Sequence, residues 1–192
     1  MHHERIAILD YGSQYTRLIT RRLRELGAFG LVYGPGTTAA EIAGEDLRGV
    51  ILSGGPNSVL QANAPGMDPA ILALGIPVLG VCYGQQLMAR DLGGQIHRAA
   101  KREYGKAVIQ VTDPDSVLFQ GMDREQTVWM SHGDHVEQAP AGFLPVSRTA
   151  GVPVAAMEDR ARRRYGIQFH PEVSHTPHGN ALLLNFLHVC GM

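Results

Sequence analysis

The stretch PVLGVCYG at residues 77–84 decides the expected fold, because in it an apolar strand runs directly into a helix. The apolar residues 77–81 predict a buried strand, and the pattern of residues 85–92 predicts a helix that ends at two glycines. Cys82 lies at the junction, and Gly80 and Gly84 lie two residues before and after it. Glycine is expected at both positions, because strand and helix pass too close there for a Cβ. This Gly-x-Cys-x-Gly pattern is the cysteine counterpart of a nucleophile elbow, although it also fits a small core cysteine beside ordinary glycines.

The segments around this junction alternate between strand and helix patterns. Near-continuous apolar strands separated by helices are typical of a parallel sheet with both faces covered. In the second half the connections are short, so we expect some strands there to be antiparallel. The predicted fold is one α/β domain over residues 1–192, flavodoxin-like, with a mostly parallel central sheet flanked by helices and additional antiparallel strands in the second half. Strands are predicted over residues 5–10, 29–33, 49–53, 77–81, 106–111, 127–130, 143–147, 154–158 and 165–169, and helices over 14–26, from a cap at Thr37 or Thr38 to 42, over 85–92 and over 179–189.

Composition excludes several classes of protein. Of the 192 residues 44% are hydrophobic, too many for a disordered chain, and a formal net charge of -1 argues against nucleic acid or an anionic membrane as the main partner. No apolar run approaches the roughly 18 residues that span a bilayer, and no signal-peptide pattern precedes the first strand. Two cysteines are too few for a disulfide scaffold. We therefore expect a cytoplasmic protein, in whose reducing surroundings a free thiol is available for chemistry.

A thiol nucleophile needs a base and a group that orients the base. His170 and Glu172 suit these roles, because both follow a buried strand at the point where Pro171 ends the ladder. A carboxylate two residues after the histidine can hold the imidazole in one tautomer. The plainer interpretation is a strand-end histidine with a solvated glutamate, but the arrival of three suitable side chains at strand ends weighs against it. We expect Cys82, His170 and Glu172 to form a catalytic triad.

A glycine-rich loop, SGGPNS at residues 53–58, follows the third predicted strand. It should reach the same edge of the sheet as the cysteine, where glycine lets a backbone N–H point into the site. We assign the N–H groups of Gly55 and Tyr83 to an oxyanion hole. The loop also resembles the Ser-Gly-Gly-x-Asp-Ser phosphate loop of ATP pyrophosphatases, but Asn57 stands in place of the aspartate and Pro56 removes a donor, so the oxyanion interpretation is preferred.

Together these segments resemble the class I, or triad, glutamine amidotransferases over nearly the whole chain, from Arg5 to Cys190. Segments 53–58, 80–86 and 168–172 carry the resemblance and occur in the order found in that family. Within the family, the chain is most similar to the amidotransferase portion of GMP synthases. The segments that carry this closer similarity are DYGSQY at 10–15, WMSHGD at 129–134 and HPEVSHT at 170–176.

The resemblance implies that the chain hydrolyses glutamine to glutamate and ammonia. Cys82 would attack the side-chain amide, and His170, oriented by Glu172, would protonate the departing ammonia and then activate water. Family similarity also implies substrate contacts. The residues that match them are Gln86 and the backbone groups of Ser131, His132 and Gly133.

The same resemblance implies a partner. The ammonia would pass to an ATP-pyrophosphatase, or synthetase, domain or subunit that converts XMP to GMP. ATP and Mg²⁺ are expected only in that partner, so no cofactor is expected in this chain. Three other functions stay open at this point: the amidotransferase component of another synthase, a free-standing cysteine hydrolase or γ-glutamyl peptidase, and a non-catalytic flavodoxin-like module that binds a nucleotide.

Other chemistry-bearing residues receive plainer interpretations. The histidine pairs 132/135 and 175/178 lack an accompanying cysteine or acidic cluster, so no metal site is expected. His135 occupies a position that is often lysine in the subfamily, and His97 is expected to have no partner. The basic run at residues 160–164 is expected to be a solvated turn, with contact to a partner domain as the alternative. Cys190 is expected to be a bystander.

Overall fold

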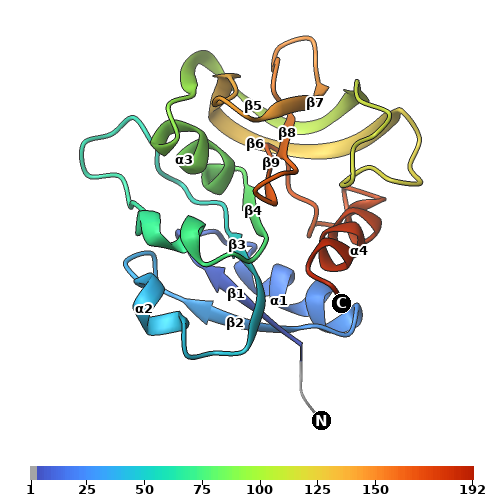
Figure 1. Cartoon of the computed structure of the whole chain (residues 1–192). Coiled ribbons are helices and arrows are strands. Elements are labelled where there is room, and N and C mark those ends of the chain that lie inside the picture. Colours follow the sequence, from blue (N-terminus) through green and yellow to red (C-terminus); the bar gives the residue numbers. More distant parts are fainter. Residues whose placement is uncertain (1–3) are drawn as a thin grey trace.

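The computed structural model describes residues 4–192 and places nine strands in one mixed sheet (Figure 1). The strands are β1 (Arg5–Leu9), β2 (Phe29–Tyr33), β3 (Leu47–Leu52), β4 (Val78–Val81), β5 (Gln95–Val111), β6 (Glu125–Gln138), β7 (Leu144–Arg148), β8 (Ala156–Asp159) and β9 (Arg164–Ile167). The helices are α1 (Thr16–Glu25), α2 (Ala39–Ile42), α3 (Tyr83–Asp91) and α4 (Gly179–Val189), with a 3₁₀ helix η1 at Pro69–Ala73. The strand order β2-β1-β3-β4-β9-β8-β7-β5-β6 brings the late strand β9 beside β4, which leads into Cys82.

The sheet has a parallel part and an antiparallel part. Strands β2, β1, β3, β4 and β9 pair in parallel, and the apolar runs of β1, β3 and β4 are buried in it. Strand β8 pairs with β9 in the antiparallel sense, as do β7 with β8 and β5 with both β7 and β6. The predicted fold class is confirmed, and the short connections in the second half do belong to antiparallel strands.

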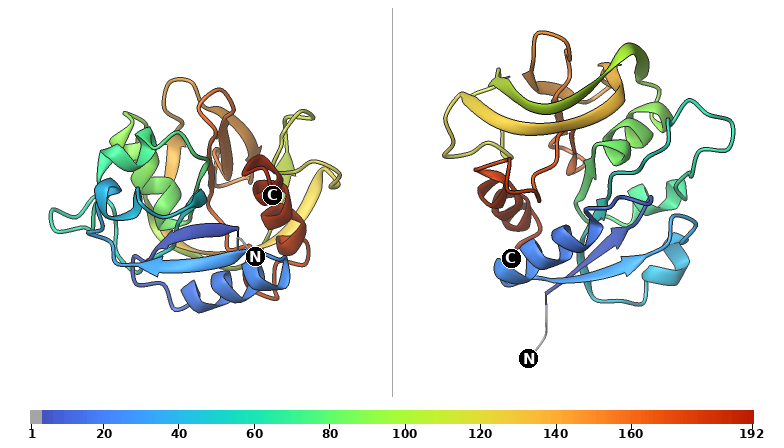
Figure 2. Two further views of the ribbon diagram at one scale, coloured as in Figure 1. Left: turned by 60° about the horizontal axis from the view of Figure 1, so that its bottom comes forward. Right: turned by 180° about the vertical axis from the view of Figure 1, so that it is seen from behind.

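Helices cover both faces of the parallel part, as the views in Figure 2 show. Ile6 and Ile8 of β1 belong to the apolar cluster that α1 and α4 cover, whereas Ala7 and Leu9 belong to the cluster that α2 and α3 cover. This alternation follows from the two-residue period of a strand and accounts for the continuous apolar run. No helix within residues 4–192 has both the length and the apolar character needed to cross a membrane.

The largest difference from the sequence prediction is the long ribbon formed by β5 and β6. We expected strands only over residues 106–111 and 127–130, but β5 begins at Gln95 and β6 continues to Gln138. The additional residues are mostly polar, which hid their strand character, and the register shifts between Arg98 and Glu103. In β6 the polar side chains of His132 and Asp134 are buried at alternate positions that continue the buried face of Val128 and Met130, so the strand period extends into a stretch whose buried positions are mainly polar. Residues 131–133 therefore lie on a strand.

The turn between β4 and α3 is the sharp junction that the sequence predicted. Cys82 has a φ of 52° and a ψ of -104°, an unusual conformation for a residue with a side chain. A Cβ at Gly84 would overlap the carbonyl oxygen of Leu52, and a Cβ at Gly80 would lie 2.6 Å from atoms of Gly84. The Cys82 N–H also donates to Ile167 O at 2.8 Å, which ties the turn to β9.

We predict that Gly84→Ala destabilises the protein by about 3 kcal/mol or more, because the new methyl group must displace the backbone of β3. Chemical denaturation followed by circular dichroism measures the change. Gly66→Ala is the matched control, since a Cβ there meets nothing within 4 Å, and it should change the free energy of unfolding by less than about 0.5 kcal/mol. Equal denaturation midpoints for the Gly84→Ala and Gly66→Ala variants would contradict the steric account of this turn.

Candidate active site

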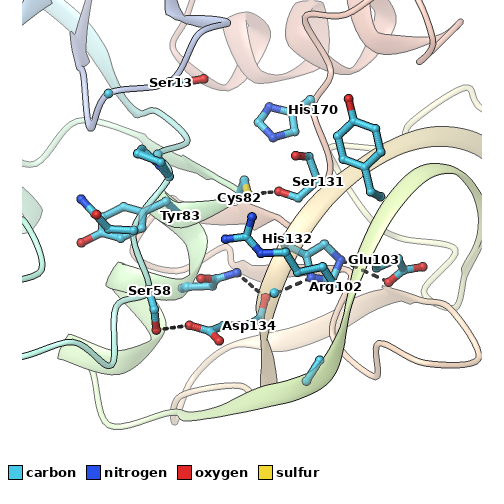
Figure 3. Close-up of a pocket in the computed structure, with 18 of the residues that line it drawn as sticks. Ser13, Ser58, Cys82, Tyr83, Arg102, Glu103, Ser131, His132, Asp134 and His170 are labelled. Carbon is cyan, nitrogen blue, oxygen red and sulfur yellow. Dashed lines mark hydrogen bonds and ion pairs between the residues drawn. The ribbon is translucent and has the colours of Figure 1, made fainter.

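A pocket of about 630 Å³ opens above the thiol of Cys82 (Figure 3). Its walls come from the loop after β1, the loop after β3, the first turn of α3, the β5–β6 ribbon and the segment after β9. The pocket therefore lies at the carboxyl ends of the parallel strands, where open α/β sheets hold their ligands. Residues from five separate parts of the chain meet there, among them Ser13, Gly55, Cys82, Glu103, Ser131 and His170.

The predicted triad residues are brought together in the fold. His170 Nδ1 lies 2.8 Å from Glu172 Oε1, and both side chains are buried. Burial opposes the imidazolium form, but the hydrogen bonds to Cys82 and Glu172 outweigh it and raise the pKa of His170 well above its ordinary value. The thiol of Cys82 donates to Ser131 O at 3.5 Å and accepts from Gln168 Nε2 at 3.6 Å. A buried base therefore lies between a thiol and a carboxylate.

Gly55 and Tyr83, whose N–H groups we assigned to an oxyanion hole, line the same pocket as Cys82. Tyr83 is the first residue of α3, so its N–H has no acceptor within the helix. A Cβ at Gly55 would lie 2.5 Å from Tyr11 O, and a Cβ at Gly54 would lie 2.9 Å from His170 Cε1 and 3.7 Å from Cys82 Cβ. The loop at residues 53–58 thus packs on the cysteine and histidine through Gly54, beside the glycine to which we assigned an oxyanion donor.

Gln86 lines the pocket one turn after Cys82, as predicted. Its Nε2 donates to Asp134 O at 2.6 Å and to Gln168 Oε1 at 3.0 Å, so both amide hydrogens are bound within the protein. The side-chain oxygen is the part of this amide that is left to accept a hydrogen bond from a ligand. Gln86 also links α3 to β6, and its contact with Gln168 places it in the same network as Cys82.

Ser131, His132 and Gly133 also line the pocket, on strand β6. The His132 ring is buried, with Nδ1 3.0 Å from Asp134 O and Nε2 3.2 Å from Glu103 Oε2. Burial lowers the pKa of His132 to about 4, so the ring is neutral near pH 7. A Cβ at Gly133 would lie 3.4 Å from the side chain of Arg102, so Arg102 lies close to this part of β6 at the pocket wall.

Several pocket residues were not predicted as site residues. Asp134 is buried, its carboxylate accepts from the Ser58 hydroxyl, and its Oδ1 lies 3.9 Å from Arg98 Nε. Arg102 extends over the same part of the pocket (Figure 3). The rings of Tyr15 and His170 form a T-shaped pair, with 5.1 Å between the ring centroids. The only sequence signal for these residues was the similarity of segments 10–15 and 129–134 to the subfamily, which gives no individual roles.

The structure also tests the plainer interpretations. The basic run forms a largely exposed turn over residues 160–163 that leads into β9, as predicted, and its guanidinium groups also bind nearby carboxylates and carbonyl oxygens. These contacts are Arg160 with Glu158 and Asp113, Arg162 with Asp159, Arg163 with Gly75 O and Arg164 with Leu72 O. His97 was expected to have no partner, yet its ring lies 5.2 Å from that of His135. Cys190 is buried against Gly49, and burial raises its pKa to about 12.

Comparison with known proteins agrees with this geometry. The sequence model of the family "Glutamine amidotransferase class-I" matches residues 7–190. The chain is 53% identical over 192 residues to the glutamine-hydrolysing GMP synthase of Geobacillus kaustophilus, covering all of this chain and 38% of that protein. It is also 53% identical over 188 residues to the enzyme of the same name from a Synechococcus strain, covering 97% of this chain and 35% of that protein.

Solved structures share the fold. A putative GMP synthase component from Thermoplasma acidophilum superposes with a TM-score of 0.83 at 28% identity, covering 100% of this chain and 96% of that one. A glutamine amidotransferase from Thermotoga maritima gives a TM-score of 0.80 at 18% identity over the whole of both chains, a likeness of fold. The chain spans just over a third of the length of the two curated relatives. With nearly all of its residues matched by one family, the chain belongs to the class-I glutamine amidotransferases.

Proposed function

We propose that this chain hydrolyses the side-chain amide of glutamine with Cys82, His170 and Glu172 as its catalytic triad. The observation that carries the proposal is the buried His170–Glu172 pair beside a thiol that stands on a strained turn. A structural cysteine needs neither a positive φ nor an oriented imidazole. Both features are what a thiol nucleophile with a general acid–base partner requires.

In the first half of the reaction, the Cys82 thiol gives its proton to His170 Nε2 and its sulfur attacks the amide carbon. The tetrahedral intermediate collapses when the imidazolium protonates the leaving nitrogen, which departs as ammonia and leaves a γ-glutamyl thioester. In the second half, His170 takes a proton from water, whose oxygen attacks the thioester. Glutamate leaves when the proton returns to the sulfur, so the enzyme ends as it began. Glu172 stabilises the imidazolium in both halves.

The oxyanion of each intermediate would be held by the N–H groups of Gly55 and Tyr83. Hydrogen-bond donors of this kind act strongly because the surrounding protein excludes water. The Gln86 side-chain oxygen and the backbone of residues 131–133 would contact the substrate. The carboxylate of Asp134 and the nearby Arg98 and Arg102 side chains give the pocket both signs of charge, which suits the ammonium and carboxylate of an amino acid.

We further propose that the ammonia serves a synthetase partner that uses ATP and Mg²⁺ to convert XMP to GMP. The supporting observations are the relatives named GMP synthase and the share of their length, 38% and 35%, that this chain covers. ATP and Mg²⁺ would bind to that partner, and no cofactor is needed for the steps assigned to this chain. We propose that the reaction takes place in the cytoplasm.

We predict that Cys82→Ala lowers kcat for glutamine hydrolysis by at least about 10³-fold, because no other thiol within residues 4–192 lines the pocket. A coupled assay that detects glutamate measures the rate. Cys190→Ala, which removes the other cysteine, is the matched control and should keep kcat within about twofold. Residual activity above one tenth in Cys82→Ala would exclude the thiol as nucleophile.

We predict that Glu172→Gln moves the alkaline limb of the kcat/KM–pH profile to lower pH. The carboxylate helps to raise the pKa of His170, so its loss lets the imidazolium deprotonate at lower pH, and the acid that protonates ammonia disappears earlier. The value of kcat at neutral pH should fall by at least about tenfold. Glu45→Gln, at an exposed ion pair with Arg5, is the control. If the alkaline limb does not move, Glu172 does not orient the His170 imidazole as proposed.

The partner proposal is tested by mixing this chain with the synthetase portion of a relative and supplying ATP, Mg²⁺, XMP and glutamine. We expect glutamine-dependent GMP formation and faster glutamine hydrolysis than this chain gives alone. The Cys82→Ala chain should support no glutamine-dependent synthesis. Rapid hydrolysis of γ-glutamyl peptides without a partner would favour a free-standing hydrolase instead.

A further inference from the structure

The backbone of the catalytic histidine is held by a threonine hydroxyl that lies outside the triad. Thr176 Oγ1 donates to His170 O at 2.6 Å and accepts from Trp129 N at 3.0 Å. The N–H of His170 donates to Trp129 O at 3.0 Å. The hydroxyl therefore completes a second bridge between His170 and Trp129, in which one oxygen serves as donor and acceptor together.

Strand β6 connects this bridge to the nucleophile. Ser131, two residues after Trp129 on the same strand, accepts from the Cys82 thiol through its carbonyl oxygen at 3.5 Å. The strand that contacts the sulfur is thus the strand to which Thr176 fastens the histidine. Any change in the separation of Trp129 and His170 would alter the position of the imidazole relative to the sulfur.

The segment that carries Thr176 forms a tight turn that fixes the backbone of this residue beside His170. Thr176 is buried, its N–H donates to Val173 O at 3.1 Å, and its carbonyl accepts from Gly179 N at 3.0 Å. A Cβ at Gly179 would overlap the carbonyl oxygen of Pro171, so the chain folds tightly back on itself between these residues. The turn fixes Thr176 before α4 begins and holds it beside His170.

A buried position makes the hydroxyl difficult to replace. Without it, the Trp129 N–H and the His170 carbonyl would each lose their bond in an environment from which water is largely excluded, and each unpaired group costs about 1–3 kcal/mol. The protein would recover part of this energy by moving the segment after β9. That segment carries both His170 and Glu172.

From this geometry we propose that Thr176 is a positioning residue, whose hydroxyl sets the alignment of the His170 imidazole with the Cys82 sulfur. The proposal rests on the proposed function for its consequence in catalysis, but the alignment itself is a property of the thiol and the imidazole. It can therefore be measured without glutamine. Serine keeps the hydroxyl, whereas valine keeps the shape and removes both hydrogen bonds.

The test compares alkylation of Cys82 by iodoacetamide in the full chain carrying Thr176→Val, Thr176→Ser or Thr149→Val. Peptide mass spectrometry assigns the modified cysteine. Thr149 is the control, because its hydroxyl likewise makes two hydrogen bonds to the backbone, accepting from the N–H groups of Gly151 and Val152, but lies outside the pocket lining. Circular dichroism checks folding, and Thr176→Ala is the second variant if valine prevents it.

We expect Thr176→Val to slow alkylation at about pH 6.5 by roughly tenfold, since small misalignments of reacting groups have effects of this size or larger. At about pH 10 all variants should react alike, because hydroxide is then available to take a thiol proton and the alignment of the imidazole no longer limits the reaction. Thr176→Ser and Thr149→Val should stay within about threefold of the unaltered chain at both pH values. For glutamine, Thr176→Val should lower kcat and leave KM within about twofold.

Two results would overturn the positioning role: unchanged alkylation at pH 6.5 in Thr176→Val or Thr176→Ala, or the same change at both pH values, which would indicate altered access to the thiol. A serine variant as slow as valine would also overturn it. If the alkylation pattern appears but the unaltered chain does not hydrolyse glutamine, the proposed function fails and the positioning role stands. If the unaltered chain hydrolyses glutamine and the pattern is absent, only the positioning role fails.

Discussion

The close crossing of β3, β4 and α3 at Cys82 is the constraint on which the rest of the site depends. A residue with a side chain held at a positive φ is destabilising by about 1–3 kcal/mol, so the surroundings must impose it. Here the absence of side chains at Gly80 and Gly84 lets the backbones approach, and bonds from Cys82 N to Ile167 O and from Gly84 N to Ser53 O hold the turn. The thiol consequently lies beyond the end of β4, at the N-terminus of α3, where it lines the pocket.

The sheet topology then brings the other groups to that thiol. Strand β9 is late in the chain but pairs directly with β4, so its continuation delivers His170 and Glu172 to the same edge as the turn. Strand β3 lies on the other side of β4 and leads into the loop of Gly54 and Gly55. The groups proposed as nucleophile, base and oxyanion donors thus follow three adjacent parallel strands, and the β5–β6 ribbon supplies the remaining wall of the pocket.

The parts of the site that sequence could predict are those with a local steric or chemical requirement. Gly80, Cys82 and Gly84 indicate the turn by their spacing, and His170-Pro171-Glu172 indicates the end of a strand by its proline. The polar extension of β5 and β6 could not be found in this way, because it has no apolar face and its pairing partner is distant in sequence. Asp134 acquires its contact with Ser58 only when the ribbon meets the loop after β3, and Thr176 acquires its contact with Trp129 only when the ribbon meets the segment after β9. The predicted role of Gln86 as a substrate contact is narrowed to its side-chain oxygen, because its amide hydrogens are bound within the protein.

The measurement that tests the central claim most directly is covalent labelling with a diazoketone analogue of glutamine, followed by peptide mass spectrometry. A triad that recognises glutamine predicts a single adduct on Cys82, formed at a rate that excess glutamine lowers, with Cys190 left unmodified because it does not line the pocket. Labelling of Cys190, or labelling of Cys82 that glutamine does not slow, would contradict the assignment of this pocket as a glutaminase site.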